Sequence, residues 1–298
     1  MKAPVNKIIH FSTVDGPGSR TAIFLQGCNI NCRYCHNPET RNLCIGCGVC
    51  VKACPAGALS LLREAAFGRS AADHSTRKGR VAAAKVWYDP EKCVGCDTCI
   101  RVCRHGCSTR IRELTPEQVM DEIRKNQPFI RGITVSGGEC TLYPDFLTEL
   151  FGLCRAEGLG TLIDSNGTLH FADYPKLLEV SDGVMLDVKA WDEREHVKVT
   201  GAHNRLILQN AEELARTGKL YEVRTVVVPG LFDYEQTVRE TTRLVSPYRD
   251  RGYIRYKLIK YRPVGVRKEY AVYESPSDAV MEALAEIVKR EGLDTVII

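Results

Sequence analysis

Fourteen cysteines are unusual for a chain of 298 residues, and eleven of them fall into three short runs between Cys28 and Cys103. The N-terminal segment lacks the apolar core of a signal peptide, which favours a reducing compartment, the cytoplasm. In such a compartment, closely spaced thiols bind metals more often than they form disulfides. We therefore expect metal clusters rather than disulfide bonds.

The first run has the spacing Cys-x3-Cys-x2-Cys and consists of Cys28, Cys32 and Cys35, directly after an apolar segment. Three thiolates can hold three irons of a cubane cluster and leave the fourth iron open to a substrate or cofactor. A structural zinc site requires four ligands. The alternative interpretation is therefore a zinc site completed by His36.

The other two runs each repeat the Cys-x2-Cys-x2-Cys-x3-Cys spacing of bacterial ferredoxins. In two-cluster ferredoxins, the fourth cysteine of each run binds the cluster of the other run. We therefore assign Cys44, Cys47, Cys50 and Cys103 to one [4Fe–4S] cluster, and Cys93, Cys96, Cys99 and Cys54 to a second. Two zinc sites are the alternative.

Three cysteines lie outside these runs. Cys107 comes four residues after Cys103 and can compete with it as a ligand. Cys140 is expected to be a small buried residue, although a catalytic role is the alternative. Cys154 lies on the apolar face of a predicted helix and is expected to belong to the core.

Strand-like and helical patterns alternate outside residues 40–112. The strand-like segments are Thr21–Gln26, Gly132–Ser136, Gly160–Ser165, Gly183–Lys189, Glu222–Pro229 and Tyr253–Tyr261. Helices are expected after a capping box at Thr115, from about Pro144, and over Asn204–Thr217, Asp233–Val245 and Ser277–Arg290. The alternation predicts an α/β fold with a parallel sheet and right-handed crossovers. Six units are too few for a closed eight-stranded barrel, so we expect a partial, TIM-like (β/α)6 barrel.

Residues 40–112 interrupt this alternation and hold the two ferredoxin-like runs. We predict a barrel formed by residues 1–39 and 113–298, with a ferredoxin-like insert of two [4Fe–4S] clusters at 40–112. The basic, small-residue stretch Arg69–Lys85 is expected to be a surface linker or mobile loop. Contact with an acidic partner is its alternative role.

Polar residues follow three of the predicted strands. The segment Ser136–Glu139 (SGGE) contains glycines that allow close approach of a ligand to the backbone. Asp164–Gly167 ends the next strand, and Met185–Lys189 ends the one after it. In strand geometry Asp187 and Lys189 point the same way, so they can form a polar pair around a ligand. The alternatives are an ordinary turn and a structural salt bridge.

The overall charge is nearly balanced, with 41 basic and 37 acidic residues and a net charge of +4. A concentrated basic surface, which nucleic acids and anionic membranes favour, is not indicated. No apolar run reaches the roughly 18 residues of a membrane span. We expect neither nucleic acid nor membrane as a partner.

The first cysteine run resembles the cluster-binding motif of radical S-adenosylmethionine (SAM) enzymes, with the usual aromatic residue at Tyr34. The resemblance implies that SAM chelates the open iron and that the reduced cluster splits it to a 5′-deoxyadenosyl radical. It implies SAM contacts at Tyr34, Cys35, His36, Gly137, Gly138, Glu139, Ser165, Asp187, Val188, Lys189 and Arg262. It further implies a monovalent cation held by Asp164, Ser165, Met185 and Asp187. Arg262 stands where relatives carry a histidine near the adenine, on which a guanidinium can stack.

The segment Val14–Arg20 (VDGPGSR), together with Cys35–Pro38 (CHNP), resembles the glycyl radical enzyme activating enzymes, most closely their YjjW-like branch. The similarity covers nearly the whole chain, including the insert. It implies a monomer with three [4Fe–4S] clusters that abstracts hydrogen from a glycine of a glycyl radical enzyme. Flavodoxin or ferredoxin would supply electrons through the insert, for which a structural or docking role is the alternative. The other possible functions are a radical SAM enzyme acting on a small molecule and a non-catalytic iron–sulfur electron-transfer protein.

Overall fold

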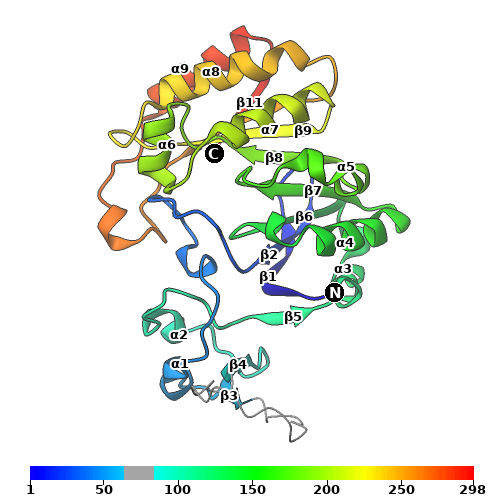
Figure 1. Cartoon of the computed structure of the whole chain (residues 1–298), viewed down its shortest axis with the longest axis vertical. Helices are drawn as coiled ribbons and strands as arrows, with labels where there is room; N and C mark the ends of the chain where they lie inside the picture. Colours follow the sequence, from blue (N-terminus) through cyan, green and yellow to red (C-terminus); the bar gives the residue numbers. More distant parts are fainter. Residues whose placement is uncertain (64–83) are drawn as a thin grey trace, which may run out of the picture.

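The computed structural model describes residues 1–63 and 84–298. In this part of the chain, nine strands form one mixed sheet in the order β11-β10-β9-β8-β7-β6-β2-β1-β5 (Figure 1). The strands are β1 (Ala3–Ser12), β2 (Arg20–Leu25), β5 (Arg112–Leu114), β6 (Gly132–Gly137), β7 (Gly160–Ser165), β8 (Gly183–Asp187), β9 (Leu220–Val227), β10 (Arg255–Lys260) and β11 (Asp294–Ile297). The neighbouring strands from β2 to β11 are parallel. With β5 and β11 at its two edges, the sheet is open, as the predicted partial barrel requires.

Helices connect the parallel strands and cover the outer side of the sheet (Figure 1). They are α3 (Pro116–Arg124), α4 (Pro144–Ala156), α5 (Pro175–Val180), α6 (Glu193–Thr200), α7 (Arg205–Arg216), α8 (Tyr234–Val245) and α9 (Asp278–Arg290). Short 3-10 turns lie at η1 (Pro38–Thr40), η2 (Gln127–Phe129), η3 (Cys140–Leu142), η4 (Phe171–Asp173), η5 (Ser246–Tyr248) and η6 (Lys268–Tyr270). The predicted capping box is present, because Gln118 N donates to Thr115 Oγ1 and Thr115 N donates to Gln118 Oε1.

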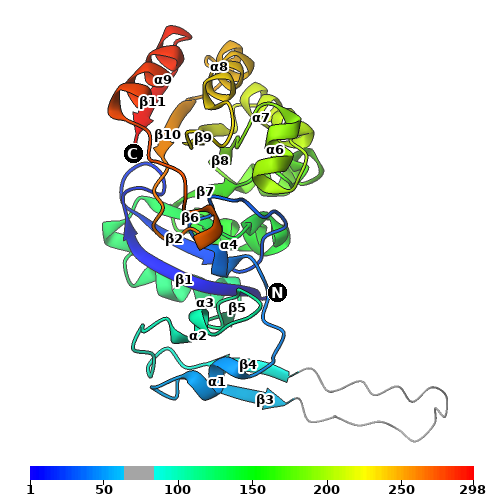
Figure 2. The ribbon, with the colours of Figure 1, turned by 90° about the vertical axis from the view of Figure 1, so that its left-hand side faces the viewer.

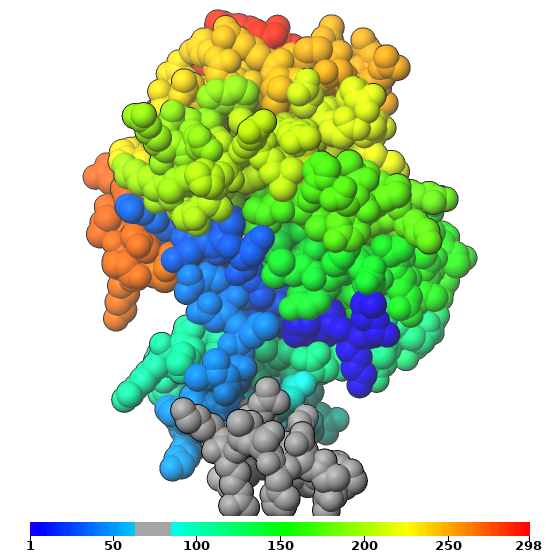
Figure 3. All heavy atoms as spheres, viewed as in Figure 1, coloured from blue at the N-terminus to red at the C-terminus, as the bar shows by residue number. Residues whose placement is uncertain are grey.

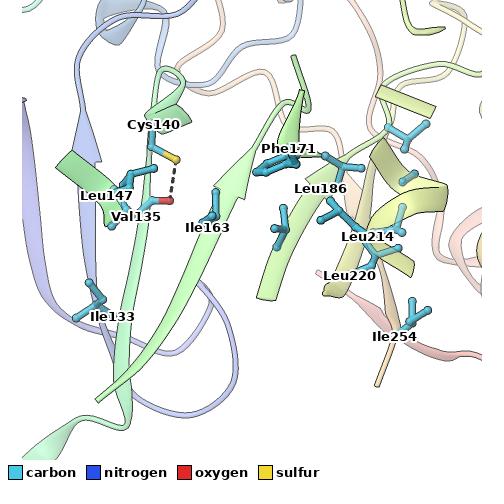
Figure 4. Packing of buried hydrophobic residues seen from close by; sticks show 14 of the residues in the cluster. Ile133, Val135, Cys140, Leu147, Ile163, Phe171, Leu186, Leu214, Leu220 and Ile254 are labelled. Carbon is cyan, nitrogen blue, oxygen red and sulfur yellow. Dashed lines mark hydrogen bonds between the residues drawn. The ribbon is translucent and has the colours of Figure 1, made fainter. Parts of the chain in front are cut away.

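The core lies between the sheet and these helices (Figure 4). Its strand residues form nearly continuous apolar runs, as is typical of parallel strands covered on both faces. Cys154 is fully buried on α4, and Cys140 is fully buried after β6. The Cys140 Sγ donates to the carbonyl oxygen of Val135 at 3.2 Å. Both cysteines are therefore core residues, as predicted.

The two ferredoxin-like runs lie at one end of the molecule's long axis, below the sheet in both views (Figures 1 and 2). This part contains α1 (Val49–Ala53), α2 (Thr98–Arg101) and the antiparallel pair β3 (Leu59–Arg63) and β4 (Ala84–Tyr88). The predicted linker Arg69–Lys85 falls outside the described residues, except for its last two, which begin β4. All fourteen cysteines are described, and none is in a disulfide.

Outside residues 40–112, two helices, α5 and α6, and three strands, β1, β5 and β11, were not predicted from the sequence. β1 pairs in antiparallel fashion with both β2 and β5. The insert begins after β2 and ends at β5, so the chain leaves the sheet and returns to it near the same edge. Among residues 1–63 and 84–298, no helix is both long and apolar enough to cross a bilayer.

Candidate functional site

The cysteine loop after β2 is held in place by backbone hydrogen bonds at both ends. The amide of Gly27 donates to the carbonyl of Thr40 at 2.8 Å, and the amide of Arg33 donates to the carbonyl of Val199 at 2.8 Å. The second contact joins the loop to the C-terminal end of α6. The loop is thus fixed by its backbone, and its three cysteine side chains are free to face the site.

The carboxyl ends of the parallel strands and the cysteine loop enclose a cavity of about 310 Å³. Twelve of the predicted site residues line it, namely Cys28, Cys32, Tyr34, Cys35, His36, Gly137, Gly138, Glu139, Asp164, Ser165, Asp187 and Lys189. In the space-filling view, the cysteine-loop region (blue) reaches the surface between the α6 region (yellow-green) and the loop after β10 (orange) (Figure 3). Met185, Val188 and Arg262 do not line the cavity.

The two glycines of the SGGE segment allow two strand ends to approach each other closely. A Cβ atom on Gly137 would lie 2.1 Å from the carbonyl oxygen of Leu25, and one on Gly138 would lie 2.2 Å from that of Gly27. The amide of Gly138 donates to Leu25, and the amide of Glu139 donates to Gly27. The glycines therefore support the base of the cysteine loop, in addition to lining the cavity.

Glu139 is almost completely buried, and both of its carboxylate oxygens accept hydrogen bonds from the protein. Oε1 accepts from Ser165 Oγ at 3.0 Å and from the amide and hydroxyl of Thr141. Oε2 accepts from the amide of Asn166 at 2.7 Å. Burial raises the pKa of Glu139. The Glu139 side chain thus positions the end of β7 through Ser165 and Asn166. The SGGE segment that contains Glu139 lines the cavity.

The predicted polar pair is formed. Lys189 Nζ donates to Asp187 Oδ2 at 2.7 Å and lies 5.9 Å from the centre of the Tyr34 ring. Burial alone would lower the pKa of Lys189, but Asp187 and neighbouring groups raise it well above its usual value. Lys189 is therefore a buried cation beside the cysteine loop. Cys32, in that loop, is one of the groups that raise the pKa of Lys189.

Arg224, on β9, was not predicted to belong to the site. Its Nη1 lies 2.8 Å from Asp164 Oδ2, and its Nη2 lies 2.9 Å from Met185 Sδ. Two of the four residues predicted to hold a monovalent cation therefore already contact a guanidinium. Arg224 also lines the cavity. Arg224 lies 35 residues after the Met185–Lys189 motif, and only sheet pairing brings it beside Asp187, so no local pattern indicated its role.

Arg262 differs from expectation, because it is exposed and lies outside the cavity lining. Arg267, five residues further on, lines the cavity and donates to the carbonyl oxygen of Cys32 at 2.9 Å. Gly265 approaches the carbonyl oxygen of His36 so closely that a Cβ would lie 2.6 Å from it. This turn reverses the chain after β10 and brings the later arginine to the site instead.

Asn166 is a second site residue that the sequence analysis did not assign. Its Nδ2 lies 3.8 Å from Cys28 Sγ and 3.2 Å from Asn29 Oδ1. The asparagine stands in the segment after β7 that the motif analysis had already singled out. It connects that strand end to the first cysteine of the loop.

In the insert, one cavity joins cysteines of both ferredoxin-like runs. Cys54 lines it together with Cys93, Cys96 and Cys99, across the interface of α1 and α2. This is the set expected if the fourth cysteine of each run belongs to the other cluster. Burial raises the pKa of Cys99, which lies deepest of the four.

The cysteines assigned to the other insert cluster, Cys44, Cys47, Cys50 and Cys103, do not line one common cavity. Cys50 is buried, and Cys47 is exposed and lines a separate shallow cavity beside α1. Cys103 Sγ lies 3.5 Å from the sulfur of Cys107, and Cys44 is a further close neighbour of Cys107. Cys44 and Cys103 thus approach each other through Cys107, which sequence analysis had left as a competitor.

These donor sets fit iron–sulfur clusters better than single metal ions. Within residues 1–63 and 84–298, no three His, Cys, Asp or Glu side chains converge tightly enough for one ion. A cubane takes each thiolate on a different iron, so its ligands are more widely spread. The buried hydroxyl of Tyr34 has no partner and borders the first cysteine cavity, which leaves a polar group for a ligand beside such a cluster.

Comparison with known proteins agrees with this geometry. The radical SAM superfamily matches residues 90–245, a 4Fe-4S dicluster domain matches 43–107, and a 4Fe-4S single cluster domain matches 14–56. In fold, the chain resembles QueE from Escherichia coli, with a TM-score of 0.52 and 12% identity over 100% of this chain and 94% of that one.

Several relatives are similar over nearly their full length. The indoleacetate decarboxylase activating enzyme of Tractidigestivibacter scatoligenes is 31% identical, covering 100% of this chain and 98% of its own. The benzylsuccinate synthase activating enzyme of Thauera aromatica is also 31% identical (98% and 92%). The choline trimethylamine-lyase activating enzyme of Oleidesulfovibrio alaskensis is 28% identical (97% and 96%). The chain belongs to the radical SAM superfamily and, within it, to the glycyl radical enzyme activating enzymes.

Proposed function

We propose that this enzyme installs a glycyl radical on a partner glycyl radical enzyme. A [4Fe–4S] cluster on Cys28, Cys32 and Cys35, with SAM bound, supplies a 5′-deoxyadenosyl radical by reductive cleavage, and this radical abstracts hydrogen from a partner glycine. The observation that carries the proposal is the cavity of about 310 Å³ in which three cysteines face the Asp187–Lys189 pair. Three thiolates leave one iron for a small ligand, and the cavity has room for that ligand.

The chain's own residues bind and orient the cofactor. Lys189 is a buried cation suited to a carboxylate or ribose oxygen, and Asp187 holds it in place at 2.7 Å. The unpartnered hydroxyl of Tyr34 offers a further hydrogen bond. The predicted contacts His36, Gly137, Gly138 and Ser165 border the same space. A monovalent cation beside Asp187 would share Asp164 with Arg224.

We also propose that residues 40–112 carry two further [4Fe–4S] clusters, on the two cysteine sets assigned above, and relay electrons from flavodoxin or ferredoxin. Asn42, two residues before Cys44, donates to the carbonyl of His105 at 2.6 Å. Gln26 of the barrel in turn donates to the carbonyl of Asn42. These bonds support a barrel-side position for the cluster that includes Cys44, so electrons would enter through the other cluster.

We propose that the enzyme acts as a monomer in an anaerobic cytoplasm, where thiols and reduced clusters persist.

The test of the proposed function is hydrogen transfer from the partner. A candidate partner with a C-terminal Arg-Val-x-Gly-type loop is produced with deuterated glycine and mixed anaerobically with the reconstituted, reduced enzyme and SAM. We expect a glycyl radical signal in electron paramagnetic resonance (EPR) and deuterium in the 5′-deoxyadenosine. The partner with ordinary glycine is the control. SAM cleavage without either signal would instead favour a small-molecule substrate.

A further inference from the structure

The two ferredoxin-like runs form an internal repeat, and the repeat includes the position four residues after the last cysteine of each run. Cys54 is followed four residues later by Ala58, and Cys103 is followed four residues later by Cys107. Both of these later residues are buried, with 2% and 1% of their surface exposed. Each follows the same turn, since the amides of Gly57 and Gly106 donate to the carbonyls of Cys54 and Cys103. Cys107 therefore adds a thiol at a position where the other half has only a methyl group.

The extra thiol lies between two cysteines that come from different runs. Its sulfur is 3.5 Å from the sulfur of Cys103, and the thiol of Cys44 is a further close neighbour. A disulfide requires a distance of about 2.0 Å, so these are separate thiols. Cys44 and Cys103 are the two members of one proposed cluster that belong to opposite halves of the insert. Cys107 thus faces that cluster's position from inside the protein.

We propose that the site of the barrel-side insert cluster holds five thiols, and that Cys107 completes the cluster when Cys103 does not. This inference rests on the proposed function only in assuming that a cluster binds there. The exchange moves one iron–thiolate bond between two sulfurs. The incoming thiol loses its proton and the departing thiolate takes one up, so the charge and oxidation state of the cluster do not change.

The second insert cluster provides a control within the same molecule. Its cavity has Cys54 at the position of Cys103, and Ala58 at the position of Cys107. No spare thiol stands there, so removal of Cys54 leaves that cluster with three thiolates. The two halves should therefore respond differently to the same substitution. A purely packing role for Cys107 predicts that they respond alike.

The experiment counts insert clusters in the full chain. The starting protein carries Cys28→Ala, Cys32→Ala and Cys35→Ala, so that only the insert clusters remain, and it is reconstituted anaerobically with iron and sulfide. We measure iron per chain after mild oxidation and gel filtration, and the EPR spectrum of the oxidised protein, in which a cluster that has lost an unligated iron gives a [3Fe–4S] signal. In this background, Cys103→Ala should keep its full iron content without that signal, whereas Cys103→Ala with Cys107→Ala should lose the one unligated iron and show the signal. Cys54→Ala alone should also lose one iron and show the signal.

A transplant gives a second, independent test. Adding Ala58→Cys to Cys54→Ala should restore the full iron content, because the new thiol occupies the position that Cys107 has in the other half. Loss of iron in Cys103→Ala alone would overturn the proposal, as would full retention in the Cys103→Ala and Cys107→Ala double variant. Failure of Ala58→Cys to restore the cluster would contradict the equivalence of the two positions.

These outcomes are independent of SAM chemistry. A protein that fails to cleave SAM but binds the insert clusters as described would contradict the proposed function and leave the ligand exchange supported. The converse result, SAM cleavage by the wild type together with loss of iron from Cys103→Ala, would overturn the exchange alone. The far-ultraviolet circular dichroism of each variant is compared with that of the parent to detect unfolding. Loss of iron from an unfolded Cys103→Ala variant also counts against the proposal.

Discussion

At the residue scale, side chains and glycines have separable tasks around the cysteine cavity. Gly137 and Gly138 let β6 approach β2, Glu139 positions the end of β7, and Lys189 with Asp187 offers charge to a ligand. Motif analysis found all five positions because glycines and carboxylates at strand ends are conspicuous. It interpreted the glycines as ligand contacts, since backbone contacts between distant strands leave no local pattern in a sequence.

Gly137→Ala should destabilise the protein strongly. The new Cβ would lie 2.1 Å from the carbonyl oxygen of Leu25, and the residue has a φ of +127°. The strained backbone alone costs about 1–3 kcal/mol, before the clash is counted. Gly152→Ala on α4 is the matched control, because nothing lies within 4 Å of its added Cβ and alanine favours a helix by about 1 kcal/mol. Denaturant unfolding of both variants measures the difference, and equal stabilities would contradict the packing role.

Lys189→Met should weaken SAM binding by at least about tenfold, since a buried charge-assisted hydrogen bond is lost. Anaerobic equilibrium dialysis of the reconstituted protein with labelled SAM measures the affinity. Lys176→Met, which changes an exposed lysine on α5, is the control and should bind SAM normally. Unchanged affinity in Lys189→Met would show that the Asp187–Lys189 pair is a structural salt bridge.

At the element scale, the six central strands and the longer helices follow from apolar periodicity and capping residues. The predicted strand ends are accurate to within two residues at β6, β7 and β8, which is why the site residues after them were found. The strands β1 and β11 were missed because both have mixed burial and lack a continuous apolar run. Arg224 was missed for a related reason, since its role depends on which strands are neighbours.

The charged cluster between β9 and β10 should stabilise the sheet in a pH-dependent way. Glu222 is fully buried and contacts Arg224, Arg255 and Lys257. Burial would raise its pKa, but Arg224 and Lys257 lower it below the usual value of 4.5. A lowered carboxylate pKa stabilises the fold above the unfolded-state value, and this contribution is lost as the pH falls through the folded-state pKa.

Glu222→Gln should accordingly cost about 3–5 kcal/mol at neutral pH, because Arg224, Arg255 and Lys257 all lose a charged partner. The difference from the wild type should begin to shrink below about pH 4.5, where the carboxylate of the unfolded chain becomes protonated, and should vanish as the pH falls through the lower folded-state pKa. Glu213→Gln removes an exposed partner of Arg216 and should cost at most about 1 kcal/mol. Urea unfolding as a function of pH measures both. A difference that stays constant down to acid pH would contradict the assignment.

Removal of the outer insert cluster should separate electron delivery from radical chemistry. In the variant with alanine at Cys54, Cys93, Cys96 and Cys99, we expect SAM cleavage with dithionite and loss of at least about 90% of the rate with flavodoxin, because the protein donor has lost its entry point. Cys154→Ala, in the barrel core, is the control and should retain both activities. Equal loss with both reductants would instead indicate a structural role for the insert.

At the scale of the whole molecule, the barrel and the cysteine-rich part lie at opposite ends of the long axis, joined through β5 and the segment after the cysteine loop (Figure 2). The cysteine spacings predicted the insert, because cluster ligation demands fixed spacings along the chain, and the alternation of strand-like and helical segments predicted the barrel. Contacts between the parts, such as Gln26 with Asn42 and Glu39 with Ser108, have no such pattern. They orient the insert against the barrel and are visible only in the folded chain.

Reductive cleavage of SAM by the enzyme alone is the most direct test of the open iron beside Cys28, Cys32 and Cys35. The reconstituted protein is reduced with dithionite under anaerobic conditions, and 5′-deoxyadenosine and methionine are quantified. We predict equal amounts of both products from the wild type and none from the triple alanine variant of these cysteines. Absence of both products from the wild type with a fully assembled first cluster would contradict radical SAM chemistry at this site.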